Sequence, residues 1–316
     1  MNSSSKTKAS VTDGRQAAEA PSLARTISAY YRLTKPGIIY GNSLTTAAGF
    51  LFAAGMAGSP GVSWGTFVAT LVGSGLVIAC GCVLNNYIDR PIDARMRRTR
   101  GRPLISGEVS VAGAMVLAAI TGLAGLILLL AFTNLVTVYV GLLGLYTYVV
   151  AYGYAKRRSP WGTLVGSIPG ATPIVAGYTA VAGRTDLTAL ALFIIMAAWQ
   201  IPHFYAIAIY RLKDYQAAGI PVFAAVKGIA ATKRHIIGSI IVFIATLGGL
   251  YLLGPVSATG LIVTMAVSTV WLYKAVRGLP VKEGKSTDTW ARGVFGFSLL
   301  VLLTLSATLA LDRFLP

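Results

Sequence analysis

Long apolar runs recur along this chain and are separated by shorter polar segments. A helix needs about 20 largely apolar residues to cross the hydrocarbon core of a bilayer, since each residue adds about 1.5 Å of rise. The runs lack the period-two alternation that the strands of a membrane barrel would show. The pattern therefore predicts nine transmembrane helices, over residues 38–56, 64–87, 109–132, 135–152, 161–182, 187–210, 235–253, 256–273 and 293–311.

The polar segments alternate between nearly uncharged and strongly basic. Of the 27 Lys and Arg residues, 25 fall before the first run or in every second connection, which leaves Arg184 and Arg313 on the other side. Because Lys and Arg concentrate in cytoplasmic loops, we expect a cytoplasmic N-terminus and an external C-terminus. The net charge of +17 would suggest a nucleic-acid partner in a soluble protein. Here it reports membrane orientation, and no nucleic acid is expected.

Composition agrees with this interpretation. Only 12% of the residues are charged and 55% are hydrophobic, whereas soluble globular chains carry about 25% charged residues. Cys80 and Cys82 stand one residue apart in an apolar run, which supports neither a disulfide framework nor a zinc site. We expect an all-α polytopic membrane protein with a disordered cytoplasmic tail over 1–32, a membrane domain over 33–316, and cytoplasmic loops over 88–108, 153–160, 211–234 and 274–292.

The few acids carry more information than the many bases, because a charge at membrane depth is costly and tends to be functional. Asp89, Asp93 and Asp214 follow the cytoplasmic ends of the second and sixth runs. Asn85, Asp89 and Asp93 recur every four residues, a spacing that stacks side chains on one face of a helix. Pro91 predicts that this helix ends or bends just before it.

This acidic cluster has the composition of a magnesium site. Two carboxylates at the negative end of a helix dipole repel each other and need a cation. Oxygen ligands with incomplete coordination favour Mg²⁺, which commonly shares its ligands with substrate phosphates, and guanidinium groups bind the remaining phosphate oxygens. Taken singly, each nearby base is equally well explained as a topological signal. Together with the acids they predict a diphosphate site that includes Arg98, Arg102, Lys156 and Arg157.

A histidine lies inside the sixth run, about seven residues or roughly 10 Å from its cytoplasmic end. Pro202 beside it frees a backbone carbonyl, which a purely structural His203 would satisfy. Its depth and its neighbours Trp199, Gln200 and Tyr205 favour a substrate-facing role instead.

These motifs resemble the UbiA-type intramembrane prenyltransferases, whose Asn- and Asp-rich motif binds a prenyl diphosphate through Mg²⁺. The pattern Asn85-x-x-x-Asp89-x-x-x-Asp93, followed by a basic loop, carries this resemblance. Within the family the chain is most similar to the heme farnesyltransferase branch. That similarity depends on the blocks Leu33-Thr34-Lys35-Pro36-Gly37, Met96-x-Arg98-Thr99-x-x-Arg102-Pro103-Leu104, Lys156-Arg157-x-Ser159, Trp199-Gln200-x-Pro202-His203-Phe204 and Asp214-Tyr215-x-x-Ala218-Gly219-Ile220-Pro221.

The resemblance implies transfer of the farnesyl group of farnesyl diphosphate to a vinyl group of heme b, giving heme o and diphosphate. It assigns metal binding to Asp89 and Asp93, with Asn85 as an accessory ligand. It assigns heme contact to His203, at the iron or the propionates, and to Gln200. Heme b and farnesyl diphosphate would be substrates, and Mg²⁺ the cofactor. The aromatic faces considered for stabilising an allylic cation are Tyr87, Tyr178 and Tyr205.

The sequence departs from the family pattern at two places. Asn86 stands where many relatives carry Asp, and Asp214 is followed by Ala218 where many carry a second acid. A second metal is therefore doubtful on sequence grounds. Arg211, Lys213 or Lys156 would carry part of the phosphate charge in its place.

Two other functions fit parts of the pattern. A prenyltransferase acting on an aromatic quinone precursor would share the diphosphate chemistry, but the Trp-Gln-x-Pro-His block argues against it. A transporter would also have many spans, yet its charged residues are expected near the midplane and not at one face. The expected location is a bacterial cytoplasmic (inner) membrane in preference to the mitochondrial inner membrane, and the resemblance implies a downstream heme-modifying enzyme or terminal oxidase as a partner.

Overall fold

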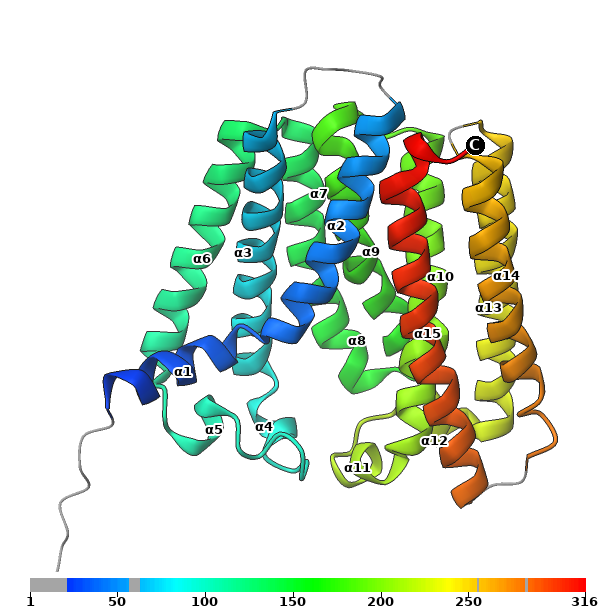
Figure 1. Ribbon diagram of the computed structural model, residues 1–316. Coiled ribbons are helices and arrows are strands. Elements are labelled where there is room, and N and C mark those ends of the chain that lie inside the picture. The colour runs from blue at the N-terminus through cyan, green and yellow to red at the C-terminus, as the bar shows by residue number, and fades with distance from the viewer. Residues whose placement is uncertain (1–21, 57–62, 255, 282–283) are drawn as a thin grey trace, which may run out of the picture.

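Long helices stand side by side in one bundle, and short helices lie at one end of it (Figure 1). The computed structural model describes residues 22–56, 63–254, 256–281 and 284–316, and the elements in these ranges are helices. The short helices are α1 (Leu23–Leu33), α4 (Arg90–Asp93), α5 (Pro103–Ser106), α11 (Leu212–Ala217) and α12 (Phe223–Lys227).

Within these ranges, eight helical segments are long and apolar enough to cross a bilayer, so the chain is a multi-pass membrane protein. They are α3 (Trp64–Ile88), α6 (Val111–Phe132), the continuous run of α7 (Leu135–Tyr146), η1 (Thr147–Tyr152) and α8 (Gly153–Arg158), α9 (Gly162–Ala182), α10 (Leu187–Tyr210), α13 (Ile229–Leu252), α14 (Ala258–Val276), and α15 (Lys285–Leu311) continued by η2 (Asp312–Phe314). The first predicted span is α2 (Pro36–Met56), a 21-residue helix that is not among the eight. Asn42, Thr45 and Thr46 lower its hydropathy.

Helix ends differ from the predicted boundaries where a helix continues past its apolar stretch. The last span begins at Lys285 instead of residue 293, and α13 begins at Ile229, inside a predicted loop. The fourth continues to Arg158 through the π-helical segment η1, so most of the predicted loop 153–160 is helical. Hydropathy reports where a helix leaves the apolar zone, but a helix ends only where its backbone hydrogen bonding ends.

The predicted disordered tail contains a helix. Ser22 caps α1 by accepting a hydrogen bond from the Arg25 backbone N–H at 3.4 Å. Ala29 and Leu33, one turn apart, are buried against α3, α5 and α6. The tail was predicted from its polar composition, which hides the apolar spacing of this last part. Residues 1–21 of the predicted tail lie outside the described ranges.

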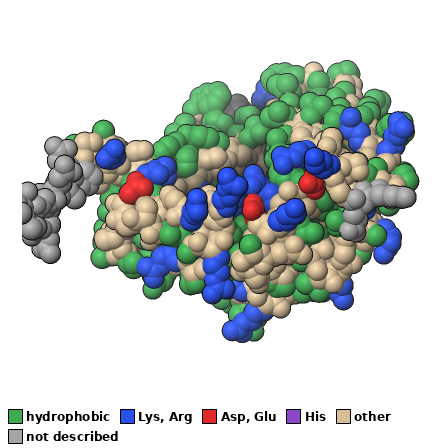
Figure 2. All heavy atoms as spheres, turned by 90° about the horizontal axis from the view of Figure 1, so that it is seen from below, with side chains coloured by type: hydrophobic (Ala, Val, Ile, Leu, Met, Phe, Trp, Pro, Cys, Tyr) green, Lys and Arg blue, Asp and Glu red, His purple; other side chains and the backbone are tan. Residues whose placement is uncertain are grey.

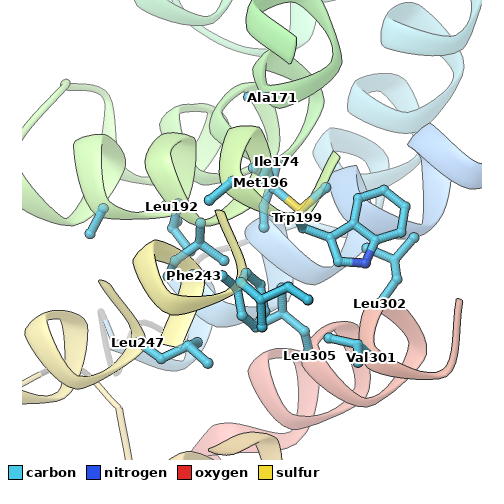
Figure 3. Close-up of a cluster of buried hydrophobic side chains, with 14 of the residues drawn as sticks. Ala171, Ile174, Leu192, Met196, Trp199, Phe243, Leu247, Val301, Leu302 and Leu305 are labelled. Carbon is cyan, nitrogen blue, oxygen red and sulfur yellow. The ribbon is translucent and has the colours of Figure 1, made fainter. Parts of the chain in front are cut away.

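The largest apolar core lies between α9, α10, α13 and α15. Figure 3 shows Leu192, Met196 and Trp199 of α10 meeting Phe243 of α13 and Leu305 of α15. The indole N–H of Trp199 donates to the Ser298 carbonyl oxygen at 2.8 Å, which satisfies the one polar atom of that side chain.

Helices α2 and α9 approach each other through glycine. A Cβ on Gly177 would stand 2.1 Å from the Thr46 carbonyl oxygen, and one on Gly49 would stand 2.2 Å from that of Ile174. Only glycine allows such backbone contact, which holds α2 against the centre of the bundle.

Basic side chains gather at the end of the bundle that carries the short helices. Figure 2, which views the molecule from that end, shows many Lys and Arg side chains and few acids around a hollow. This is the charge sorting expected from the sequence, now seen as one face of the molecule.

Candidate functional site

The Asn85, Asp89 and Asp93 side chains lie together because α3 ends and turns at this point. Asp89 is the residue that caps the C-terminus of α3, and its backbone N–H still bonds the Asn85 carbonyl oxygen at 2.9 Å. Pro91 follows in the first turn of the short helix α4, which ends at Asp93. The break predicted before Pro91 is therefore present. All three polar side chains are buried and line the same cavity.

Both carboxylates are paired with cations from other segments. Lys156 Nζ lies 2.7 Å from Asp89 Oδ2, and Arg157 Nη2 lies 3.0 Å from Asp89 Oδ1. Arg102 pairs with Asp93 through Nη1 and Oδ2. Burial alone would raise the pKa of Asp89, but the charges and hydrogen bonds of Lys156 and Arg157 outweigh it and hold that pKa below its usual value. Asp89 is thus an ionised, buried carboxylate.

Lys35 is a site residue that the sequence reasoning counted only as a topological charge. It lies between α1 and α2 with a φ of 53°, and its Nζ donates to Asn85 Oδ1 at 2.8 Å. Removal from water lowers the pKa of Lys35 to about 8, and the charges of Arg102 and Lys156 act in the same direction. The Leu33-Thr34-Lys35-Pro36-Gly37 block was the available signal, but it gave no indication of what Lys35 contacts.

The π-helical segment η1 brings two tyrosines to the same end. Tyr148 and Tyr152 stack with ring centroids 5.9 Å apart, and the Tyr148 hydroxyl donates to Asn85 Oδ1 at 3.4 Å. Single π-helical turns inside α-helices often mark functional sites, because the extra residue re-aims the side chains that follow. Lys156, one turn after Tyr152, is aimed at Asp89 in this way.

The aromatic residues suggested from the sequence lie elsewhere. The Tyr178 hydroxyl donates to Asp186 at 2.8 Å, Tyr205 stacks on Phe223, and Tyr87 carries Arg90 over its ring. The tyrosines that line the cavity are Tyr148, Tyr152, Tyr210 and Tyr215.

One cavity of about 870 Å³ joins these groups to the middle of the bundle. Its charged lining consists of two carboxylates, Asp89 and Asp93, and five cations, which are Lys35, Arg98, Arg102, Lys156 and Arg211. The remaining lining is mostly apolar and comes largely from α2, α3, α7, α9, α10 and α15. The net positive charge at one end and the apolar walls beyond it suit an amphiphile with an anionic head.

His203 and Gln200 line the part of this cavity formed by α10. His203 Nδ1 lies 2.8 Å from Ser298 Oγ, and the Ser298 hydroxyl donates to the Phe295 carbonyl oxygen at 2.6 Å. Since that hydroxyl hydrogen is already used, Ser298 Oγ accepts from His203 Nδ1–H, and a neutral ring then carries its lone pair on Nε2. Gln200 instead braces α9, because its Nε2 donates to the Ser167 carbonyl oxygen at 3.2 Å.

The second predicted acid does not join the first two. Asp214 lies on α11 and pairs at 3.5 Å with Arg211 three residues before it. Neither Asp214 nor Lys213 lines the cavity, whereas Arg211 and Tyr215 do. Arg157 is also absent from the lining and reaches the site only through Asp89 and the Ile88 carbonyl oxygen.

The oxygen donors of this site fit a hard divalent cation whose coordination shell is completed by oxygen atoms of the substrate. In the described ranges no group of three or more His, Cys, Asp or Glu side chains could hold a metal by itself. Two carboxylates and one amide oxygen leave coordination positions open, as is common for Mg²⁺ bound with phosphates. Asn85 Nδ2 is buried without a hydrogen-bond partner among the described residues and can donate to an anion there.

The chain is similar in sequence to known proteins. The sequence profile of the UbiA prenyltransferase family matches residues 43–310. A curated protoheme IX farnesyltransferase from Citrobacter koseri is 46% identical over 288 residues, which cover 91% of this chain and 95% of the relative.

Solved structures share the fold. A structure of digeranylgeranylglyceryl phosphate synthase aligns with a TM-score of 0.74 at 16% identity, over 91% of this chain and 98% of that one. A UbiA homologue from Archaeoglobus fulgidus bound to GPP and Mg²⁺ aligns with a TM-score of 0.62 at 17% identity, over 89% of this chain and 99% of that one. At such identities the likeness concerns the fold.

Proposed function

This chain belongs to the UbiA prenyltransferase family, and we propose that it transfers the farnesyl group of farnesyl diphosphate to a vinyl group of heme b, giving heme o and diphosphate. Its similarity to a protoheme IX farnesyltransferase extends over nearly the full length of both chains. The observation that carries the proposal is the single cavity whose charged end holds Asp89 and Asp93 and whose apolar part reaches His203.

The diphosphate binds at the charged end. Five cations against two carboxylates leave an excess of positive charge that an anionic head group neutralises. Lys156 and Arg102 now pair with Asp89 and Asp93, and each has further donors for phosphate oxygens. Lys35 and Arg98 complete the ring of donors, and Arg157 is a positioning residue that holds Asp89 in place.

The metal ligands in this proposal are Asp89 and Asp93, with Asn85 Oδ1 as an accessory donor. Bound there, Mg²⁺ would supply Lewis-acid neutralisation of the charge that develops on the departing diphosphate. The fold relative bound to GPP and Mg²⁺ supports this choice of metal.

The reaction is an electrophilic alkyl transfer. The bond between farnesyl C1 and its oxygen breaks, and its electron pair leaves on the diphosphate, where Lys35, Arg102 and Lys156 stabilise it. The faces of Tyr148 and Tyr152 stand at this end of the cavity and suit the allylic cation. The vinyl π electrons of heme form the new C–C bond, and water adds to the remaining cationic carbon with loss of a proton.

His203 contacts the heme. Its Nε2 lone pair is directed by the Ser298 hydrogen bond and suits the iron, while a protonated ring would suit a propionate. Gln200 forms the wall beside it and fixes the spacing of α9 and α10. Asp214 acts only at the rim, through its ion pair with Arg211, and Lys213 precedes it in α11 outside the cavity lining.

The membrane arrangement follows from the charge sorting. We place all nine predicted spans, α2 included, across a bacterial cytoplasmic membrane, with the N-terminus and the face shown in Figure 2 on the cytoplasmic side. A water-soluble diphosphate would then enter from the cytoplasm. Heme o would pass to a downstream heme-modifying enzyme or terminal oxidase.

A choice between acceptors tests the proposal. Purified protein in detergent is incubated with Mg²⁺ and farnesyl diphosphate, together with either heme b or 4-hydroxybenzoate, and products are identified by mass. A hydroxyethylfarnesyl heme in the first reaction alone is the expected result. Prenylation of 4-hydroxybenzoate without a heme product would establish the quinone-precursor alternative. Absence of both products, with uptake of either compound into proteoliposomes, would favour a transporter.

A further inference from the structure

The helix α1 has an exposed apolar face that nothing in the described chain covers. Leu23, Ile27 and Tyr31 recur every four residues and so share one face. Their exposed fractions are 76%, 60% and 50%. The exposed Arg25, Ser28 and Arg32 lie on another face of the same helix. This is the pattern of a helix that lies between an apolar phase and water.

The helix is oriented across the bundle and not along it. In Figure 1, α1 lies almost perpendicular to α3 and α6 at their lower end and extends outward beyond α6. Ala29 and Leu33 bury the inner side of α1 in a cluster with Val83, Val109 and Ala114. The outward part of the helix therefore lies at the height where a bilayer around the bundle would end.

Two contacts fix the rotation of α1 about its own axis. The Tyr31 hydroxyl meets the hydroxyl of Tyr40, which is 64% exposed on the first turns of α2. The Tyr31 end of the apolar face thus lies beside the first turns of α2. Arg32 pairs with Glu108, which precedes the first residue of α6 at the basic end of the bundle. The basic face of α1 is thus turned toward that end.

We propose that α1 lies in the plane of the bilayer surface, with Leu23, Ile27 and Tyr31 among the acyl chains and Arg25 at the headgroups of anionic phospholipids. Apolar area and attraction to anionic lipid together drive such binding. The helix leads directly to the site, since the Leu33 carbonyl oxygen accepts from Asn86 Nδ2 at 2.8 Å and Lys35 follows two residues later. Lipid binding by α1 would therefore fix the position of the segment Leu33–Lys35, from which Lys35 Nζ bonds Asn85 Oδ1.

Spin labels at adjacent positions test this placement. Ile27→Cys places the label on the apolar face, and Ser28→Cys is the matched control on the polar face. The native Cys80 and Cys82 are buried, and wild-type protein treated with the same spin label measures any background labelling at these two residues. Each labelled protein is reconstituted in phosphatidylcholine vesicles with and without phosphatidylglycerol. Collisions with oxygen, which concentrates in lipid, and with a water-soluble nickel chelate are then measured by electron paramagnetic resonance.

The expected result is that the label at position 27 collides with oxygen and not with the nickel chelate. The label at position 28 should collide with the nickel chelate and much less with oxygen. Phosphatidylglycerol should move the label at position 27 deeper into the bilayer, which raises its collisions with oxygen relative to those with the nickel chelate. Arg25→Gln should remove that effect. Equal access of the nickel chelate to both labels would overturn the proposal. So would protection of position 27 from both reagents with dipolar broadening, because a second copy of the chain would then cover the face. No response to phosphatidylglycerol would overturn the role of anionic lipid.

Discussion

At the scale of single residues, the decisive contact is that between Lys156 and Asp89. A carboxylate with no exposed surface is held ionised by two cations that come from a helix more than sixty residues away in sequence. Lys156 lines the cavity and Arg158, two residues later, is exposed with its guanidinium over Tyr154. The same basic segment therefore contains one residue of the site and one of the surface.

This difference gives a matched pair of variants. We expect Lys156→Met to lower kcat/KM for farnesyl diphosphate by about 100-fold, because the variant loses the partner of Asp89 and, under the proposed function, a diphosphate donor. Arg158→Met should stay within about twofold of the wild type. Initial rates of heme o formation against farnesyl diphosphate concentration measure both. Equal losses in the two variants would mean that the segment contributes only general positive charge.

The same scale shows what the sequence could predict and what it could not. The four-residue spacing predicted that Asn85, Asp89 and Asp93 would converge, because a helix end is local geometry. Lys35 was missed because it reaches Asn85 across fifty residues, from a backbone conformation with positive φ that no propensity favours. The role of Asp214 stays a prediction, since α11 pairs it with Arg211 and leaves it outside the cavity lining.

At the scale of elements, the packing of α2 on α9 depends on Gly49 and Gly177. The nine apolar runs predicted these helices well, because hydropathy identifies buried and lipid-facing segments alike. Which helices touch was not predictable, since a glycine in a membrane helix can serve close packing, a kink or a ligand pocket. The contact with the Thr46 carbonyl oxygen identifies Gly177 as a packing glycine.

A pair of glycine variants tests this contact. Gly177→Ala should destabilise the protein by about 1–3 kcal/mol, because its methyl group would meet backbone. Gly238→Ala, in α13, has no atom near its added methyl group and should be neutral or stabilising by up to about 1 kcal/mol. Thermal unfolding in detergent compares the two. An unchanged melting temperature for Gly177→Ala would mean that α2 and α9 do not touch there.

The start of α10 gives a pH-dependent prediction. Asp186 caps this helix by accepting from the Ala189 backbone N–H at 3.0 Å and from the Tyr178 hydroxyl. Burial opposes its ionisation, but these hydrogen bonds and Arg184 outweigh that effect and lower the pKa of Asp186 below 3.8. The folded state therefore prefers the carboxylate, so its stabilisation is complete above the unfolded pKa and is lost as the pH falls below that value.

Replacing this carboxylate should remove its share of the pH dependence. We expect Asp186→Ala to lose about 1 kcal/mol of stability at pH 7, mostly as the lost cap. The difference in melting temperature from the wild type should shrink as the pH is lowered from 5 to 3. A difference that stays constant over this range would show that the charge of Asp186 does not contribute.

At the scale of the whole molecule, the charge sorting and the cavity describe one arrangement. Most of the +17 lies at the end of the bundle where the short helices gather, and part of it turns inward around Asp89 and Asp93. The sequence predicted the side of the membrane from loop charges. The sequence could not distinguish Lys and Arg side chains that face the cavity from those on the surface. That distinction depends on where the helix ends and the short helices place each side chain.

The central claim is that this inward-facing charge binds a prenyl diphosphate together with Mg²⁺. Its most direct test is calorimetric titration of the wild type and of Asp93→Asn with farnesyl thiodiphosphate, an analogue that ionises very slowly. The account predicts binding by the wild type that requires Mg²⁺, and affinity at least about tenfold weaker in Asp93→Asn. Equal affinity with and without Mg²⁺, unchanged in Asp93→Asn, would contradict it.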